Sequence, residues 1–209
     1  MNLLEIPMGS KAAVLVLTRE RPERIFEDTS GMDQSRSINL AEKFLGGIPR
    51  QSGVVPLDLA VWPEEGAACV ASFPHFDVVC SRKIAQDRPS EIIVDIARLA
   101  GLRSAYAVCM ESSRDWTSIL AWSPKGVTRA VSLSPEGGVV EDVGKRLPFE
   151  IPFWAGKYPV RERGYQLPFH PIDLGNEALR VFFGFILEGA EDDLCVDPEE
   201  IEIPIFHCP

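Results

Sequence analysis

Apolar residues along this chain recur with the spacing of β-strands in some segments and of α-helices in others. The clearest strand candidate is the run AAVLVLT at residues 12–18, whose continuous branched apolar side chains predict a buried strand. Six further segments show strand-like patterns: residues 57–62, 68–73, 76–80, 105–109, 116–122 and 127–133. The tetrapeptide Ser123-Pro124-Lys125-Gly126 predicts a hairpin loop between the last two of them.

Three segments have the spacing of amphipathic helices: residues 33–45, 87–101 and about 176–187. The glycine pair 46–47 is predicted to end the first helix, and Pro89 lies in the first turn of the second. Gly189 is the predicted C-cap of the third. Gly184 lies inside that helix, where glycine costs about 1 kcal/mol relative to alanine, so it indicates close backbone packing.

Within residues 131–189, a tract of prolines and aromatic residues lies between a strand-like segment and the last helix. The prolines are Pro148, Pro152, Pro159, Pro168 and Pro171. Because proline fixes φ and removes a backbone donor, we expect neither a helix nor a central strand in this tract. Six aromatic residues alternate with the prolines, which a free linker would not require: Phe149, Phe153, Trp154, Tyr158, Tyr165 and Phe169. The tract therefore predicts an extended belt that aromatic side chains pin to the body.

The segments do not alternate strictly between strand and helix, and hairpins dominate the second half of the chain. This order predicts an α+β fold: a single domain with a mixed, largely antiparallel sheet of about six strands and two to three helices on one face. We expect residues 1–7 to form an N-terminal extension and residues 8–189 to form the domain. Residues 190–209 are expected to be an acidic segment that packs on the domain or trails from it.

Composition narrows the class of protein. The chain has 209 residues, of which 45% are hydrophobic and 25% are charged, as in a globular domain. No run approaches the ~20 apolar residues of a membrane-spanning helix, and the N-terminus lacks the pattern of a secretory signal. The five cysteines are widely spaced without a CxxC pair, which favours reduced thiols. We therefore expect a cytoplasmic protein without a membrane partner.

The net charge of −10 is unevenly distributed. Residues 181–209 contain eight acidic residues and no lysine or arginine. Nucleic acid is disfavoured as a partner, because phosphate binding requires clustered basic side chains. The acidic run is a solvated terminal segment, a face for a basic partner or, third, a calcium site, although its carboxylates lack the loop spacing and central glycine of an EF-hand.

Motifs for common nucleotide, zinc-protease and esterase sites are absent from the sequence, so no cofactor is predicted. One weaker candidate is the segment FPHFDVVC, in which His75, Asp77 and Cys80 have metal-ligating side chains. On a strand, His75 and Asp77 share one face and Cys80 points to the other. The alternative is a strand with a core cysteine and an edge acid.

A second candidate is the loop ESSRD between two apolar strands, with a hydroxyl at Ser112, a guanidinium at Arg114 and a carboxylate at Asp115. A third is His170, whose ring Asp173 could orient and which could act as a general base with Asp115. The alternatives are an ordinary polar connection and a histidine held by a loop hydrogen bond.

Three blocks in the second half of the chain are distinctive: SLSPEGGVVEDVG (132–144), LPFEIPFWAG (147–156) and LPFHPIDLGNEALRVFFGFILEG (167–189). Three others precede them: SFPHFDVVCS (72–81), DRPSE (87–91) and DWTSILAW (115–122). In this order the blocks resemble a family of uncharacterised actinobacterial proteins, the domain of unknown function DUF6928, and the first three are the most specific. Residues 8–11, MGSK, resemble the usual start of the family, which makes Met8 an alternative to Met1 as the first residue. The acidic tail resembles the family only loosely, and the resemblance implies no activity or catalytic residue.

These observations support three hypotheses from different classes. The first is a non-catalytic binding domain that meets a protein partner through an acidic or aromatic surface. The alternative is a hydrolase-like enzyme for a small molecule, which would require Ser112, Arg114, Asp115 and His170 to converge around a pocket. The third is an immunity-type inhibitor of a basic toxin. Nothing in the sequence indicates the oligomeric state.

Overall fold

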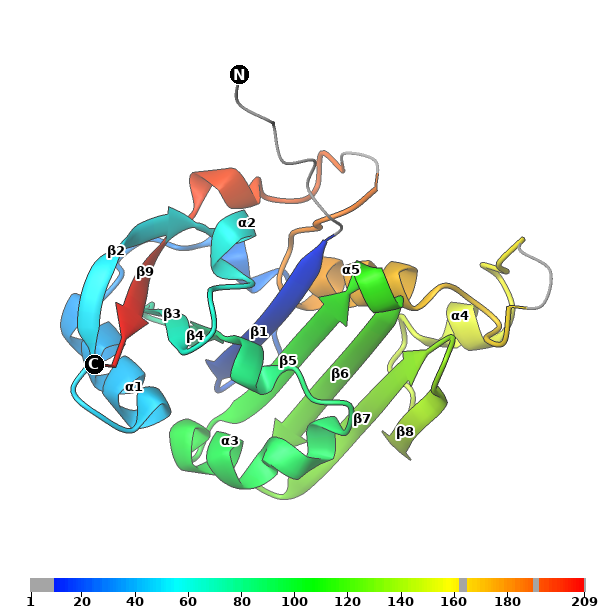
Figure 1. Ribbon diagram of the computed structural model, residues 1–209, viewed down its shortest axis with the longest axis horizontal. Coiled ribbons are helices and arrows are strands. Elements are labelled where there is room, and N and C mark those ends of the chain that lie inside the picture. Colours follow the sequence, from blue (N-terminus) through cyan, green and yellow to red (C-terminus); the bar gives the residue numbers. More distant parts are fainter. Residues whose placement is uncertain (1–9, 162–164, 190–191, 209) are drawn as a thin grey trace.

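A computed structural model describes residues 10–161, 165–189 and 192–208. The described strands form one sheet in the order β2-β9-β3-β4-β1-β5-β6-β7-β8, and every neighbouring pair is antiparallel (Figure 1). The strands are β1 (Lys11–Thr18), β2 (Arg50–Pro56), β3 (Ala67–Ser72), β4 (Phe76–Cys80), β5 (Ser104–Glu111), β6 (Trp116–Ser123), β7 (Gly126–Ser134), β8 (Gly138–Gly144) and β9 (Glu202–His207).

Helices pack on both faces of the sheet. One face carries α1 (Gln34–Leu45) and α3 (Ile93–Ala100), and the other carries α2 (Leu57–Ala60), α4 (Ile151–Trp154) and α5 (Pro171–Phe182). In β1, Ala13 and Leu15 face the first layer, whereas Val14 and Val16 face the second. Because β1 is central and covered on both sides, its apolar residues are continuous instead of alternating.

The combination of helices with a largely antiparallel sheet confirms the predicted α+β class, but four finer predictions are wrong. The described sheet has nine strands rather than about six, and it is antiparallel throughout rather than mixed. The described residues form five α-helices rather than two to three, and these cover both faces rather than one. The missed strands are β2, β8 and β9, whose glycine, proline and acidic residues interrupt any apolar pattern. They form strands because neighbouring strands supply their hydrogen-bond partners: β2 and β8 lie at the two edges of the sheet, and β9 lies between β2 and β3.

Part of the acidic C-terminal segment lies inside the sheet. Strand β9 pairs with β2 on one side and with β3 on the other. Ile203 and Phe206 are buried there, whereas Glu202 is exposed. The apolar residues between the acids are therefore part of the core.

The segment Leu57–Trp62 was predicted to be a strand, and this prediction is wrong. Its first four residues form the short helix α2, in which Leu57 and Ala60 are both buried. These two residues are three apart, so they lie on the same side of a helical turn. An apolar run this short fits the spacing of a helix as well as that of a strand.

The first helix is confirmed and the last is displaced. In α1, the Asp33 carboxylate caps the N-terminus by accepting a 2.9 Å hydrogen bond from the backbone N–H of Arg36, and Gly46 ends the helix at φ 80°. In contrast, α5 begins at Pro171 and ends before Gly184, which has a φ of 86°. The predicted close packing at Gly184 is present, since a Cβ there would lie 3.0 Å from Arg24.

The proline–aromatic belt is anchored as predicted but is not extended throughout. Phe149, Phe153 and Phe169 are buried against the second layer. Pro152 lies in the first turn of α4, and Pro171 lies in the first turn of α5. Proline is tolerated in these positions because the first turn of a helix leaves its N–H groups unpaired in any case.

None of the helices in the described part of the chain is long and apolar enough to cross a membrane.

Candidate functional site

A cleft of about 1130 Å³ opens at the end of the sheet where β1 and β3 end and β4 and β5 begin. It is lined by one side of α1, by the C-terminal end of α3 and by the loop that follows β1. Figure 1 shows the end of β1 between α1 and α3. Loops and chain ends that gather at one end of a rigid sheet are common places for binding sites.

Asp77 lies at the base of this cleft and binds two arginines. The carboxylate is buried, with 5% of the residue exposed. Its Oδ1 accepts from Arg36 Nη2 at 2.9 Å, and its Oδ2 accepts from Arg103 Nη1. The two arginines come from α1 and from the residue just before β5. Two guanidinium groups therefore share one carboxylate, which leaves one positive charge uncompensated.

Backbone carbonyls fix the orientation of both guanidinium groups. Arg36 Nη1 donates to the carbonyl of Phe73 at 3.1 Å. Arg103 Nε donates to the carbonyl of Ala100 at 3.3 Å, in the last turn of α3, where helix carbonyls lack partners within the helix. The remaining N–H groups of both arginines are thus held in place before any ligand binds.

Ser72 adds a buried hydroxyl to the same wall of the cleft. It pairs with Asp77 across β3 and β4, so both side chains point towards the layer that holds α1. Its backbone N–H donates to Ser37 Oγ at 2.9 Å, and its carbonyl accepts from Asp33 N at 2.8 Å. Ser72 is 1% exposed, yet its Oγ has no hydrogen-bond partner among the described residues. Buried hydroxyls are normally paired, so this one is an unused hydrogen-bonding group at the wall of the cleft.

The cleft is positively charged in a negatively charged protein. Its lining has five basic side chains (Arg19, Arg21, Arg36, Lys43 and Arg103) and three acidic ones (Glu20, Glu23 and Asp77). The rest of the chain has 16 basic and 28 acidic residues. Arg36, Asn39 and Lys43 recur at helical spacing and form one stripe of donors along α1. The arrangement suits an anionic ligand.

His75, Asp77 and Cys80 do not converge on a metal. His75 is exposed before β4, Asp77 faces the α1 layer, and Cys80 is fully buried in the opposite layer. Burial holds the pKa of the Cys80 thiol well above its usual value. In the described ranges of the chain, no group of three or more His, Cys, Asp and Glu side chains is arranged to hold a metal ion.

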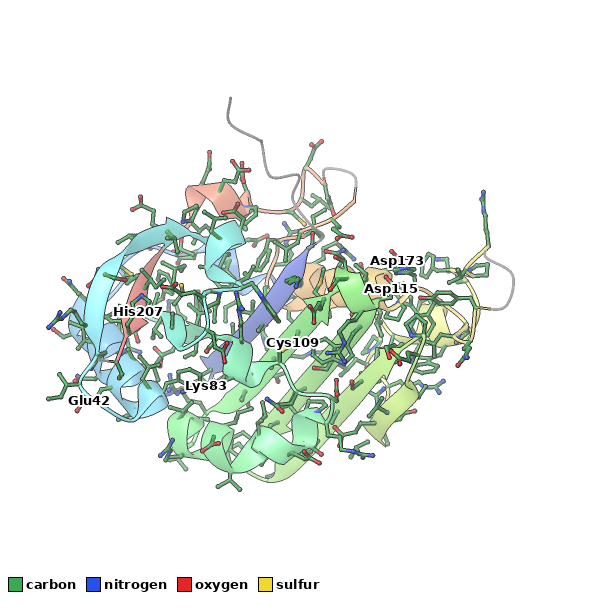
Figure 2. The ribbon with its side chains drawn as sticks, in the orientation of Figure 1. Glu42, Lys83, Cys109, Asp115, Asp173 and His207 are labelled. Carbon is green, nitrogen blue, oxygen red and sulfur yellow. The ribbon has the colours of Figure 1, made fainter. Side chains whose placement is uncertain are left out.

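Asp115 and His170 do come together, from the β5–β6 connection and the start of α5. Asp115 Oδ1 lies 3.4 Å from His170 Nε2, and both side chains are about one-third exposed, at 38% and 34%. The ring of Tyr165 stacks on His170 with centroids 5.8 Å apart. Figure 2 shows Asp115 and Asp173 on the same side of the molecule.

The other two residues of this predicted site point elsewhere. Arg114 Nη2 pairs with Asp87 at 3.1 Å, and its guanidinium lies over the ring of Trp116. Neither Arg114 nor Ser112 lines the 280 Å³ pocket next to His170. That pocket is acidic, since Asp173 and Glu188 form part of its wall.

The buried cysteines are not candidate nucleophiles. Burial raises the pKa of Cys69 and of Cys109 to about 12. The thiolate is the reactive form, so both side chains stay protonated and inert near neutral pH.

Comparison with protein families finds a match over residues 12–206, to a model described as a family of unknown function, DUF6928. The match includes every strand and helix that borders the cleft and extends into β9. No curated protein and no solved structure matches the chain.

Proposed function

The chain belongs to the DUF6928 family, and we propose that it is a binding domain whose cleft between α1 and α3 holds an anionic small molecule. One observation carries this proposal: Arg36 and Arg103 are fixed on Asp77 beside the unpartnered hydroxyl of Ser72.

Preorganised donors favour binding for a simple energetic reason. A flexible arginine loses side-chain entropy when it closes on a ligand, whereas Arg36 and Arg103 are already held by Asp77 and by backbone carbonyls. Guanidinium groups bind carboxylates and phosphates through charge-assisted hydrogen bonds, which are stronger than neutral ones. The cleft is also large enough for a small organic molecule.

Thermal unfolding with a panel of small anions at constant ionic strength tests the proposal. Citrate, sulfate, phosphate and pyrophosphate are compared with chloride, and at least one of them raises the Tm because it binds only the folded chain. Amide NMR shifts on titration map to Ser72 and Asp77. Arg103→Gln removes the response, whereas Arg98→Gln, at an exposed residue outside the lining, keeps it. If no anion raises the Tm above the chloride reference, the proposal is wrong.

A second candidate function is the hydrolase-like enzyme, favoured by the 3.4 Å contact between Asp115 and His170. In this function Asp115 orients the imidazole and His170 acts as a general base, a role that contributes about 10²–10⁴-fold to a rate. The test measures the rate at which His170→Gln and Asp115→Asn hydrolyse a chromogenic ester. His75→Gln is the matched control. Equal rates in all variants would exclude this function.

A further inference from the structure

We propose that the ligand of the cleft is a compact small molecule bearing at least two phosphate groups, one of them bound by Arg36, Arg103 and Ser72. This inference rests on the proposed function and specifies the chemistry of its ligand. It follows from the direction of the donors, from their spacing and from the residues that line the cleft.

The direction of the donors favours phosphate over carboxylate. Ser72, Arg36 and Arg103 approach from β3, α1 and the end of the α3–β5 connection, and thus from three elements. Arg36 uses two of its five N–H groups within the described protein, and Arg103 uses three. A phosphate monoester presents three acceptor oxygens in three directions and close to two negative charges. A carboxylate presents two oxygens in one plane.

The remaining cations of the cleft favour a second anionic group on the ligand. Lys43 lies seven residues after Arg36 on α1, which corresponds to about 10 Å along the helix axis. Arg19 and Arg21 line the cleft from the loop after β1. None of these three outer cations forms an ion pair within the described residues. A molecule with two separated phosphates can place one on the Arg36–Arg103 pair and the other beside these outer cations.

The lining also limits the scaffold that carries the phosphates. Among the described residues that line it there is no Tyr or Trp side chain, Phe76 is almost completely buried, and His75 supplies the one exposed aromatic ring. A nucleobase would therefore find a single imidazole ring instead of the larger aromatic surfaces on which proteins commonly stack bases. Glu20 and Glu23 lie among the outer cations and would repel a long polyphosphate chain. A small polar scaffold without an aromatic ring fits these features.

Isothermal titration of the full chain at fixed ionic strength compares two probes that each carry six anionic groups on a six-membered ring. Inositol hexakisphosphate is the phosphate probe, and benzene hexacarboxylate is the carboxylate probe. We expect the phosphate probe to bind at least tenfold more tightly. Tighter binding of the carboxylate probe would overturn the choice of phosphate and leave the anion-binding function intact. Absence of binding by both probes would remove both proposals.

Three variants locate the two phosphate positions. Ser72→Ala weakens the binding of inositol hexakisphosphate about tenfold without lowering the Tm, because the hydroxyl has no hydrogen-bond partner to lose among the described residues. Lys43→Gln lowers the affinity for inositol hexakisphosphate but leaves the affinity for inorganic phosphate unchanged. Lys83→Gln, at an exposed lysine outside the cleft, changes neither affinity. Equal effects of Lys43→Gln and Lys83→Gln would overturn the second phosphate position.

A single-stranded oligonucleotide that binds more tightly than inositol hexakisphosphate would overturn the small scaffold.

Discussion

Arg129 and Glu150 are fully buried charged residues that pair with each other. Glu150 accepts from Arg129 Nε at 2.9 Å and from Nη2 at 2.6 Å, and it also accepts from the backbone N–H of Leu147 at 3.0 Å. The Asp142 carboxylate also pairs with this guanidinium, with its Oδ1 2.5 Å from Arg129 Nη1. This network joins β7, β8 and the belt, and it contrasts with the cleft, where arginine N–H groups remain available to a ligand.

We expect Arg129→Met to lower the free energy of unfolding by about 3–5 kcal/mol, because it leaves the Glu150 carboxylate buried without its partner. The double variant Arg129→Met with Glu150→Leu recovers a large part of this loss, since no buried charge then remains unpaired and Asp142, which also loses Arg129, is partly exposed. Urea unfolding followed by tryptophan fluorescence measures both. A double variant no more stable than the single one would contradict this explanation.

The buried thiols give a prediction about pH. The pKa values of Cys69 and Cys109 are raised to about 12 by burial, so both stay protonated as the pH rises through the range where an exposed cysteine ionises. A disulfide reagent at pH 8.5 therefore labels at most Cys195 and Cys208 rapidly in the folded protein, and all five cysteines in urea. Mass spectrometry of the peptides identifies which cysteines are labelled. Rapid labelling of Cys69 in the folded protein would contradict the prediction.

At the scale of elements, the position of a helix on the sheet depends on single close contacts. Helix α5 packs on β5 and β6 through Gly175, where a Cβ would lie 2.8 Å from Thr117 Oγ1 and 3.2 Å from the Met110 sulfur. The Thr117 hydroxyl also donates to the carbonyl of Pro171 at 2.8 Å. The sequence shows the apolar side of this helix, but neither its start nor the need for glycine at this contact.

Gly175→Ala is expected to lower the free energy of unfolding by about 1–2 kcal/mol. Overpacking against Thr117 outweighs the gain of up to about 1 kcal/mol that alanine brings to a helix. Gly47→Ala is the matched control, because a Cβ there meets only the Cys208 sulfur at 3.4 Å. Thermal unfolding measures both, and equal stability of the two variants would show that α5 shifts without strain.

At the scale of the whole molecule, charge is divided between a basic cleft and an acidic surface. The predicted protein partner for the acidic C-terminal segment stays a prediction. Glu199, Glu200 and Glu202 are exposed, so they are available to a basic partner. The cleft lies at another part of the surface, and none of these three residues lines it.

Substitution of Glu199, Glu200 and Glu202 by lysine is expected to abolish capture of a basic partner in a native pull-down while the Tm changes little, because exposed charges contribute weakly to stability. The control variant replaces Glu42, Glu91 and Glu136, which are exposed elsewhere, by lysine. It therefore has the same net charge as the first triple variant. Capture that survives the first triple variant, or is lost equally in both, would contradict an acidic docking face.

Local patterns in the sequence determined the central strands, the first helix and the anchoring of the belt. Continuous apolar runs such as residues 12–18 and the cap at Asp33 depend on near neighbours, so they are visible without the fold. The sequence also determined the family, and it placed Asp115 and His170 in one hypothesis before the structure placed them 3.4 Å apart.

Only the tertiary structure decided the edges of the sheet and the cleft. Strand β9 contains proline and acidic residues and becomes a strand because β2 and β3 pair with it. Arg36 and Arg103 are 67 positions apart and look like ordinary polar residues of a helix and a loop until Asp77 joins them. Local periodicity records which side of an element is buried, whereas convergence of side chains from three elements depends on how those elements pack.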